Sequence, residues 1–183
     1  MSVIFRRRSV RSFLTKSIER DKLERVLRAG FEAPSAYNKR PWEFIVITAQ
    51  EDRAAVAEMS PYAKMLGQAT VAIAVCVNLL VGKTDSKQTT WWIQDLSAAT
   101  ENILLQAVEE GLGAVWLGWY PDEDRVSAFS ARFGLPSHVL PFSVVALGYP
   151  AKTPEPVFRL DADRIYYGAY GKKDNKAPEY RRI

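Results

Sequence analysis

The sequence has little of what metal or disulfide chemistry needs: one cysteine and one histidine in 183 residues. Cys76 alone forms no internal disulfide, which fits a reducing compartment. His138 has no histidine or cysteine to share a metal with, so we expect no metal site. A Ser–His–Asp triad through His138 stays open as an alternative, but no Gly-x-Ser-x-Gly sequence supports it. Such a chain can still be an enzyme if a bound cofactor carries the chemistry.

Long apolar runs are also missing. The longest candidate, residues 71–81, is shorter than the roughly 18 residues that a transmembrane helix needs, and it contains Asn78. The N-terminal arginines are not followed by the apolar segment of a secretory signal. With 48% hydrophobic and 25% charged residues, the composition is that of an ordinary globular protein. We therefore expect one cytoplasmic domain over residues 1–183, with no membrane partner.

Acidic residues are absent from the first eleven positions, where four arginines stand within the stretch RRRSVRSF. The first eleven residues carry +4 and residues 171–183 carry +3, and because the whole chain carries only +4, residues 12–170 carry −3. A slightly acidic body offers no broad basic face to a nucleic-acid backbone, so we expect no nucleic-acid partner. The arginine cluster instead favours a local anion such as the phosphate of a small cofactor. A basic arm without a ligand is the alternative.

Helical and strand patterns follow one another without regular alternation. Helices are expected at residues 21–33, from about residue 51, at 92–111 and at 121–133, and strands at 42–49, 69–81, 114–120 and 141–151. Proline, serine and asparagine make residues 34–41 a loop. The apolar, valine-rich run at 69–81 predicts a strand buried on both faces, in which Cys76 is an inert thiol. These patterns predict an α+β fold around one sheet.

The helix expected at 92–111 is the most persuasive one in the chain. Its apolar stripe includes Ile93, Leu96 and Ile103, Thr100 is the polar residue at the edge, and Gly111 supplies the stop signal. We expect this broad apolar face to lie against the sheet or against a partner subunit. The polar tail, rich in tyrosine, predicts an arm at about residues 160–183 on a surface of this chain or of another subunit.

Four sequence blocks occur in an order that resembles the nitroreductase family of FMN enzymes. They are RRSVRSF near the N-terminus, APSAYNKRPWEFIVI (33–47), DLSAATENILLQAVEEGLGAVWLGWYP (95–121) and LGYPA (147–151), and together they span roughly residues 5–160. The resemblance implies a three-layer fold in which helices flank a mostly antiparallel sheet. It also implies an intertwined homodimer that binds FMN at the subunit interface.

The resemblance assigns FMN binding to three segments and one later arginine. The positions are Arg7, Arg8, Ser9 and Arg11 in the first segment, Pro34, Ser35, Ala36 and Asn38 in a loop that reaches FMN from the other subunit, Trp116, Leu117 and Gly118 beside the flavin ring, and Arg159. Arginine forks suit the ribityl phosphate. By resemblance, Arg11 stabilises the charge of the reduced ring, and backbone N–H groups of Leu117 and Gly118 meet flavin N5. FMN carries the chemistry, and no side chain is assigned as catalytic.

The implied activity is ping-pong hydride transfer: NADH or NADPH reduces FMN and leaves, and a nitroaromatic, quinone or similar acceptor is then reduced. A reductive dehalogenase or a flavin-fragmenting enzyme is the alternative within the superfamily. An FMN-holding sensor or carrier without turnover is the alternative outside it.

Three loop residues depart from the family pattern at the mouth of the implied site. Our hypothesis is that Tyr37 narrows or stacks over the site, while Lys39 and Arg40 attract anionic acceptors or the phosphates of the nucleotide. Ordinary exposed loop residues are the alternative. Lys64 is either a further FMN contact or a solvated helix lysine.

Overall fold

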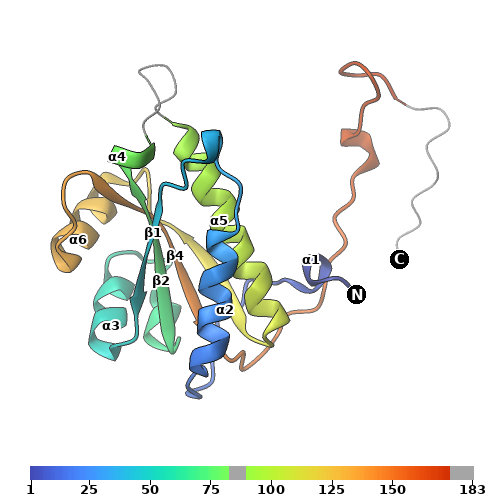
Figure 1. Cartoon of the computed structure of the whole chain (residues 1–183). Coiled ribbons are helices and arrows are strands. Elements are labelled where there is room, and N and C mark those ends of the chain that lie inside the picture. Colours follow the sequence, from blue (N-terminus) through green and yellow to red (C-terminus); the bar gives the residue numbers. More distant parts are fainter. Residues whose placement is uncertain (83–89, 174–183) are drawn as a thin grey trace.

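A four-stranded antiparallel sheet forms the centre of the molecule (Figure 1). The computed structural model describes residues 1–82 and 90–173. Its strands are β1 (Trp42–Ile47), β2 (Val71–Asn78), β3 (Gly113–Gly118) and β4 (Val139–Gly148). They are arranged in the order β1-β2-β4-β3, so the two longest strands lie in the middle.

Helices cover both faces of the sheet (Figure 1). One face carries α2 (Arg20–Phe31) and α5 (Trp91–Glu109), and the other carries α3 (Gln50–Glu58) and α6 (Glu123–Phe133). The short elements are α1 (Val3–Arg6), α4 (Leu79–Gly82), η1 (Ala36–Asn38), η2 (Lys64–Gly67) and η3 (Ala162–Arg164). No helix within the described ranges has the length and apolar composition that a membrane span requires. The expected three-layer α+β architecture is confirmed.

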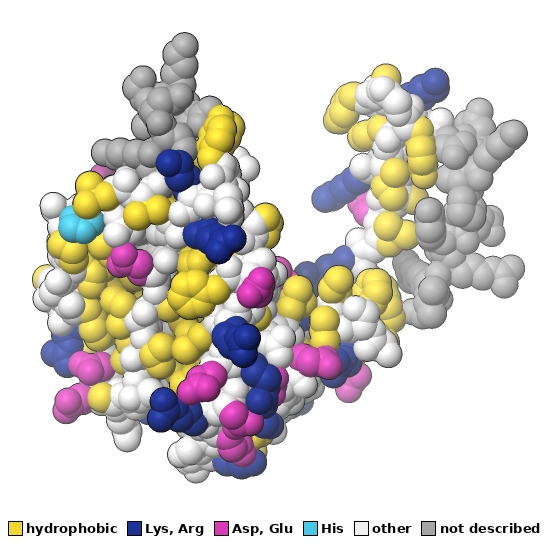
Figure 2. All heavy atoms as spheres, in the orientation of Figure 1, with side chains coloured by type: hydrophobic (Ala, Val, Ile, Leu, Met, Phe, Trp, Pro, Cys, Tyr) yellow, Lys and Arg dark blue, Asp and Glu magenta, His cyan; other side chains and the backbone are white. Residues whose placement is uncertain are grey.

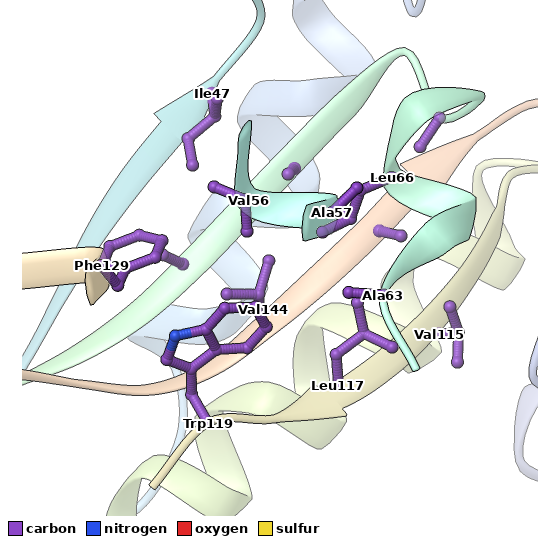
Figure 3. Packing of buried hydrophobic residues seen from close by; sticks show 14 of the residues in the cluster. Ile47, Val56, Ala57, Ala63, Leu66, Val115, Leu117, Trp119, Phe129 and Val144 are labelled. Carbon is purple, nitrogen blue, oxygen red and sulfur yellow. The ribbon is translucent and has the colours of Figure 1, made fainter. Parts of the chain in front are cut away.

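Strand β2 is buried on both faces, as its valine-rich sequence predicts. Val71, Ile73, Val75 and Val77 belong to the hydrophobic cluster beneath α2 and α5, whereas Ala72, Ala74 and Cys76 belong to the cluster on the other face. In that second cluster Val56, Leu66 and Phe129 pack from α3, η2 and α6 (Figure 3). Burial raises the pKa of the Cys76 thiol to about 12, so the thiol stays protonated and unreactive at neutral pH.

Strand β2 ends earlier than the sequence predicts. Residues 79–81 were expected to continue the strand, but they lie in α4. The side chain of Asn78 explains the change, because its Oδ1 accepts a hydrogen bond from the N–H of Leu80 at 3.0 Å. This local bond turns the chain into a helix despite its apolar composition.

The ends of α6 follow turn chemistry that is visible in the sequence. Asp122 Oδ1 accepts from the N–H of Arg125 at 3.1 Å, which makes Asp122 the N-cap. Gly134 ends the helix in the left-handed conformation, with φ at 65°. The expected stop at Gly134 is confirmed, and the expected start at Pro121 moves two residues later to Glu123.

Helix α5 lies against the sheet, with Leu96 and Ile103 fully buried. Ile93 packs partly buried against the same cluster, as the apolar stripe predicts, and Trp92 is buried beside it. Thr100 is also fully buried. Its hydroxyl donates to the carbonyl of Leu96 at 2.7 Å and lies 3.1 Å from the hydroxyl of Ser143 on β4. A polar residue on the apolar stripe is therefore satisfied within the chain.

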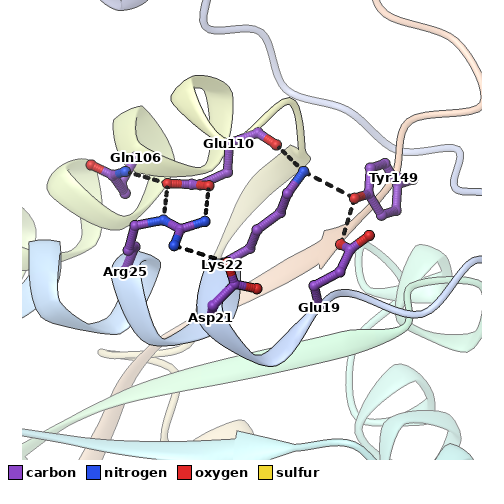
Figure 4. A network of polar contacts seen from close by, with 7 residues as sticks. All are labelled: Glu19, Asp21, Lys22, Arg25, Gln106, Glu110 and Tyr149. Carbon is purple, nitrogen blue, oxygen red and sulfur yellow. Dashed lines mark hydrogen bonds and ion pairs between the residues drawn. The ribbon is translucent and has the colours of Figure 1, made fainter.

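A polar network ties the start of α2 to the end of α5 and to the exit from β4 (Figure 4). The guanidinium of Arg25 contacts both carboxylate oxygens of Glu110, at 2.7 and 2.9 Å. Lys22 donates to the carbonyl of Glu110 at 2.9 Å and to the hydroxyl of Tyr149 at 3.0 Å. That hydroxyl donates to Glu19 at 2.6 Å. The network therefore holds the place where the C-terminal segment leaves the sheet.

Replacing Tyr149 by phenylalanine is expected to flatten the acid limb of the stability curve. The Tyr149 hydroxyl is the main cause that lowers the pKa of Glu19 from 4.5 to about 2. A carboxyl with a lowered pKa stabilises the fold above its unfolded pKa, and this contribution is lost as the pH falls towards about 2. In Tyr149→Phe the pKa of Glu19 rises, so less stability is lost on acidification.

Urea unfolding followed by tryptophan fluorescence at a series of pH values measures this effect. Tyr62→Phe is the matched control, because Tyr62 is 73% exposed. If the stability of Tyr149→Phe and of the wild type falls equally steeply on acidification, the hydrogen bond from Tyr149 does not lower the pKa of Glu19.

After β4 the chain leaves the body as an extended arm (Figure 1). Phe158 still contacts the N-terminal region, with its ring centroid 6.1 Å from that of Phe5. Large hydrophobic side chains are exposed along the arm from residue 157 onward (Figure 2): Val157, Phe158, Leu160, Tyr167 and Tyr170. The predicted arm at 160–183 is thus described as far as residue 173, and residues 174–183 lie outside the described part.

Candidate functional site

The arginine-rich segment is held against the second half of α5. Arg6 forms an ion pair with Glu109 at 2.9 Å, and Nε of Arg7 lies 3.2 Å from a carboxylate oxygen of Glu101. Burial raises the pKa of Glu101, and the positive charge of Arg7 opposes this shift. Arg7, which the sequence assigns to the cofactor, therefore also positions the segment on α5.

The backbone of this segment is anchored to the start of β3. Ser9 forms a parallel bridge with Ala114, and the N–H of Val10 donates to the carbonyl of Ala114 at 3.0 Å. Gly113 permits this close approach, because a β-carbon there would lie only 2.7 Å from Cγ1 of Val10. The segment is thus a short addition to the sheet edge, and its conformation depends on Gly113.

Two arginines of the segment have no acidic partner among the residues that the structure describes. In residues 1–82 and 90–173, no carboxylate lies within ion-pair distance of Arg8 or Arg11. Arg8 lines a cleft of about 260 Å³ together with Val108, Gly111 and Pro154. Arg11 is exposed. These guanidinium groups are available to an anion, as phosphate binding requires.

Arg159 lies on the arm directly after Phe158. Because Phe158 packs on Phe5, the arm passes α1 and the arginine segment before it leaves the body. Arg159 itself is exposed. The structure thus brings the chain at Arg159 to the region of the first segment, which lies about 150 positions earlier in the sequence.

The second predicted segment lies at the opposite end of α5. The N–H of Ala36 donates to Oδ1 of Asp95 at 2.8 Å, and burial raises the pKa of Asp95 while this hydrogen bond lowers it. A cleft of about 390 Å³ separates the loop from the start of the helix. It is lined by Pro34, Ser35, Ala36, Trp91, Gln94, Asp95 and Ala98. Asn38 uses its side chain inside the loop, where Oδ1 accepts from Nε of Arg40 at 2.8 Å.

The two segments do not meet within one chain. Asp95 holds the loop, whereas Val108, beside Arg8, follows 13 residues later, about 20 Å along the helix axis. Figure 1 shows η1 and α1 at opposite ends of α5. A single ligand that contacts both segments would need the loop of a second copy.

Strand β3 presents its predicted site residues to different surroundings. Leu117 is buried in the cluster on the α3 and α6 face, and Trp116 is half-buried on the other face, 5.8 Å from the ring of Phe142. Gly118 is exposed, and a β-carbon there would meet nothing within 4 Å. Packing inside the chain therefore does not require glycine at position 118.

Lys64, which the sequence leaves as either a further FMN contact or a solvated lysine, is exposed on η2.

Four residues of the site region are not assigned a role from the sequence: Trp91, Asp95, Glu101 and Gly113. Asp95 carried a detectable signal, because it falls on the buried stripe of α5 between Trp92 and Ala99. The role of Gly113 depends on contact with Val10, which lies about 100 residues away in the sequence. No local pattern reveals a contact of that kind.

A family model for nitroreductases matches residues 4–64 and 57–149 of this sequence. The chain belongs to the nitroreductase family. Membership makes it an oxidoreductase and confirms the resemblance drawn from the four sequence blocks.

Relatives from several organisms are similar over most of their length. A candidate NADH dehydrogenase/NAD(P)H nitroreductase of Methanothermobacter thermautotrophicus is 42% identical over 166 residues, which cover 91% of this chain and 85% of the relative. The crystal structure of a candidate NADH dehydrogenase/NAD(P)H nitroreductase from Bacteroides thetaiotaomicron has 43% identity and a TM-score of 0.84, covering 92% of this chain and 96% of its own. A candidate nitroreductase from Desulfovibrio desulfuricans was solved in complex with FMN. It has 27% identity and a TM-score of 0.76, with 92% of this chain and 95% of that chain covered.

Proposed function

We propose that this chain is an FMN-dependent oxidoreductase that uses NADH or NADPH to reduce nitroaromatic, quinone or similar acceptors as a homodimer. The observation that carries the proposal is the pair Arg8 and Arg11, held on a backbone anchored to β3 and left without a carboxylate among the described residues. In a member of the nitroreductase family, such a pair suits a bound flavin phosphate and the ring beside it.

The residues present fit FMN. Arg8 lies in a cleft, and Arg159 follows the arm segment that passes the same region, which supports a role for both in holding the phosphate. Arg11 would supply a cation for the negative charge that reduction creates. Gly118 is exposed, with open space where a β-carbon would lie, so its backbone can approach the flavin ring. Bound FMN would accept hydride from the nicotinamide and pass the electrons on to the acceptor.

A homodimer completes this site. Ser35 and Ala36 are held at the start of α5, far from Arg8 of the same chain, so the loop of the second copy would supply the missing wall. The exposed hydrophobic side chains of the arm favour the same assembly, because Leu160 is 60% and Tyr170 is 92% exposed without a second copy. The arm would bury these side chains on its partner.

Nucleotide and acceptor use the same site in turn. The half-buried side chain of Trp116 on β3 would form an apolar wall of the FMN site and exclude water from that wall of the site. The side chains bind and orient the reactants, and none of them has to donate a proton or form a covalent bond. Ping-pong kinetics follow from a single shared site.

The first experiment is an absorption spectrum of the purified protein after incubation with FMN and desalting, followed by anaerobic addition of NADH or NADPH. Retained flavin bands that bleach with a nucleotide support the proposal. Bands that persist favour a sensor or carrier, and no retained flavin overturns the assignment. Sedimentation of the same sample tests the dimer, because a monomer with bound flavin would contradict the shared site.

Turnover separates a general reductase from a specialised flavoenzyme. Steady oxidation of NADH or NADPH with both nitrofurazone and a simple quinone is the expected result. A flavin that bleaches with a nucleotide but is not reoxidised by either acceptor would instead favour the specialised alternative.

A further inference from the structure

An exposed pair of stacked aromatic rings stands at the start of α5. The rings of Tyr37 and Trp91 have centroids 5.5 Å apart and planes that differ by 6°. Tyr37 is 62% exposed and Trp91 is 38% exposed, so neither ring belongs to the hydrophobic core. Stacked rings at the surface present a flat apolar face to a planar ligand.

The loop holds Tyr37 in an unfavourable backbone conformation. The backbone φ values of Tyr37, Asn38 and Arg40 are 52°, 55° and 49°. Residues other than glycine rarely adopt positive values of this kind. A tyrosine side chain does not stabilise this left-handed backbone conformation, whereas an asparagine side chain can do so through local hydrogen bonds. Strain of this kind persists where the surroundings impose it, and it is concentrated at functional sites.

Hydrogen bonds within the loop impose this conformation. The N–H of Asn38 donates to the carbonyl of Ser35 at 3.0 Å, and the N–H of Arg40 donates to the Ser35 hydroxyl at 2.9 Å. Asp95 anchors the preceding residue, Ala36, to the helix. These hydrogen bonds therefore hold the strained loop in one conformation and fix the position of Tyr37.

Two cations follow Tyr37 closely in the same loop. Lys39 and Arg40 are exposed, and the part of the chain that the structure describes contains no carboxylate within ion-pair distance of them. The neutral Oδ1 of Asn38 orients the Arg40 guanidinium without cancelling its charge. In Figure 2, basic and apolar side chains lie side by side at this end of the molecule, where Figure 1 places η1 and the start of α5.

We propose that Tyr37 and Trp91, together with Lys39 and Arg40, form a binding platform that selects planar aromatic acceptors carrying an anionic group. The aromatic part of the acceptor stacks on the exposed rings, and its carboxylate or sulfonate meets the two cations. The inference rests on the proposed function, because it names the acceptor class for the same site. The adjoining cleft beside Ser35 and Trp91 gives the acceptor room next to the predicted flavin loop.

The test compares matched acceptors in the holoenzyme. 1,4-Naphthoquinone-2-sulfonate and 1,4-naphthoquinone share a ring system and differ in the anionic group. Lys39→Gln/Arg40→Gln is expected to lower kcat/KM for the sulfonate, relative to the neutral quinone, by about tenfold at low salt, with a smaller change at high salt. The KM for NADH is expected to stay unchanged.

The matched control is Arg20→Gln/Arg28→Gln, which removes the same charge from exposed positions of α2. It is expected to leave the ratio between the two quinones at its wild-type value. An equal ratio in the platform variant and the wild type overturns the proposal. A rise only in the KM for NADH also overturns it, because the cations would then serve the nucleotide.

A second variant tests the rings and the strain together. Tyr37→Gly relieves the positive φ, so we expect the melting temperature to rise or stay unchanged, while KM rises severalfold for both quinones and stays constant for ferricyanide. A lower melting temperature, or an equal rise for ferricyanide, would show that Tyr37 only supports the fold.

Calorimetric binding of naphthalene-2-sulfonate to the oxidised protein gives a readout without turnover. The wild type is expected to bind it about tenfold more tightly than Lys39→Gln/Arg40→Gln does. If the protein retains no flavin, the proposed function fails, and the binding measurement still decides the platform. If quinones are reduced but sulfonate binding is equal in both proteins, only the platform is wrong.

Discussion

Arg8→Gln is expected to raise the dissociation constant for FMN about ten- to a hundredfold and to leave that for riboflavin nearly unchanged. Riboflavin carries the same ring system without the phosphate. A hydrogen bond to a charged group contributes about 1.5–3 kcal/mol, which corresponds to this range of affinity. Arg8 lines a cleft and has no carboxylate partner within the described ranges, so its charge is free to meet the phosphate.

Arg6→Gln is the matched control for this measurement. Arg6 lies two positions earlier and lines the same cleft, but its guanidinium is already paired with Glu109 at 2.9 Å. We expect a change of less than about threefold in FMN affinity, because an exposed ion pair contributes little. Flavin fluorescence quenching gives both dissociation constants. Equal losses for FMN and riboflavin in Arg8→Gln would show that Arg8 supports the fold or the ring instead of the phosphate.

Gly113→Ala is expected to destabilise the fold by about 1–3 kcal/mol and to weaken FMN retention at the same time. The new β-carbon would lie 2.7 Å from Cγ1 and 2.9 Å from Cβ of Val10. Val10 is 3% exposed and branched at its β-carbon, so it has no free space to turn into. The backbone would have to move, and Arg8 and Arg11 on either side of Val10 would move with it.

Two further variants separate this clash from a general loss of glycine. Gly67→Ala is the control, because a β-carbon there meets nothing within 4 Å, and its stability and FMN retention are expected to match the wild type. Val10→Ala removes the two γ-carbons, so the double variant with Gly113→Ala is expected to be more stable than the sum of the single effects predicts. Strictly additive free energies of unfolding, measured in urea, would contradict the contact.

Helix α5 connects the stability of the fold to the candidate site. Three of its carboxylates each hold one part of that site: Asp95 binds the loop at Ala36, Glu101 pairs with Arg7, and Glu109 pairs with Arg6. The buried face of the same helix packs on the sheet. The distance between the loop and the arginine segment of one chain is therefore set by the length of one rigid helix.

Much of the architecture follows from local patterns. The valine-rich run around Cys76 is a strand with two buried faces, and the stop at Gly134 lies where the sequence predicts it. These features are encoded by neighbouring residues, whose side-chain periodicity and turn chemistry act over a few positions. The error in strand β2 is local as well: Asn78 begins a helix, although the residues that follow it are apolar like those of the strand.

The α+β class, the order of helices and strands and the membership of the nitroreductase family follow from the sequence, because each depends on periodicity or on short sequence blocks within one stretch of chain. The tertiary packing, in contrast, determines which arginines are already paired, that Gly113 must admit Val10, and that the loop at Ala36 lies far from Arg8 of the same chain. It also determines that Tyr37 stacks on Trp91. Contacts between residues this far apart in the sequence exist only after the sheet and α5 have packed, so no local pattern could specify them.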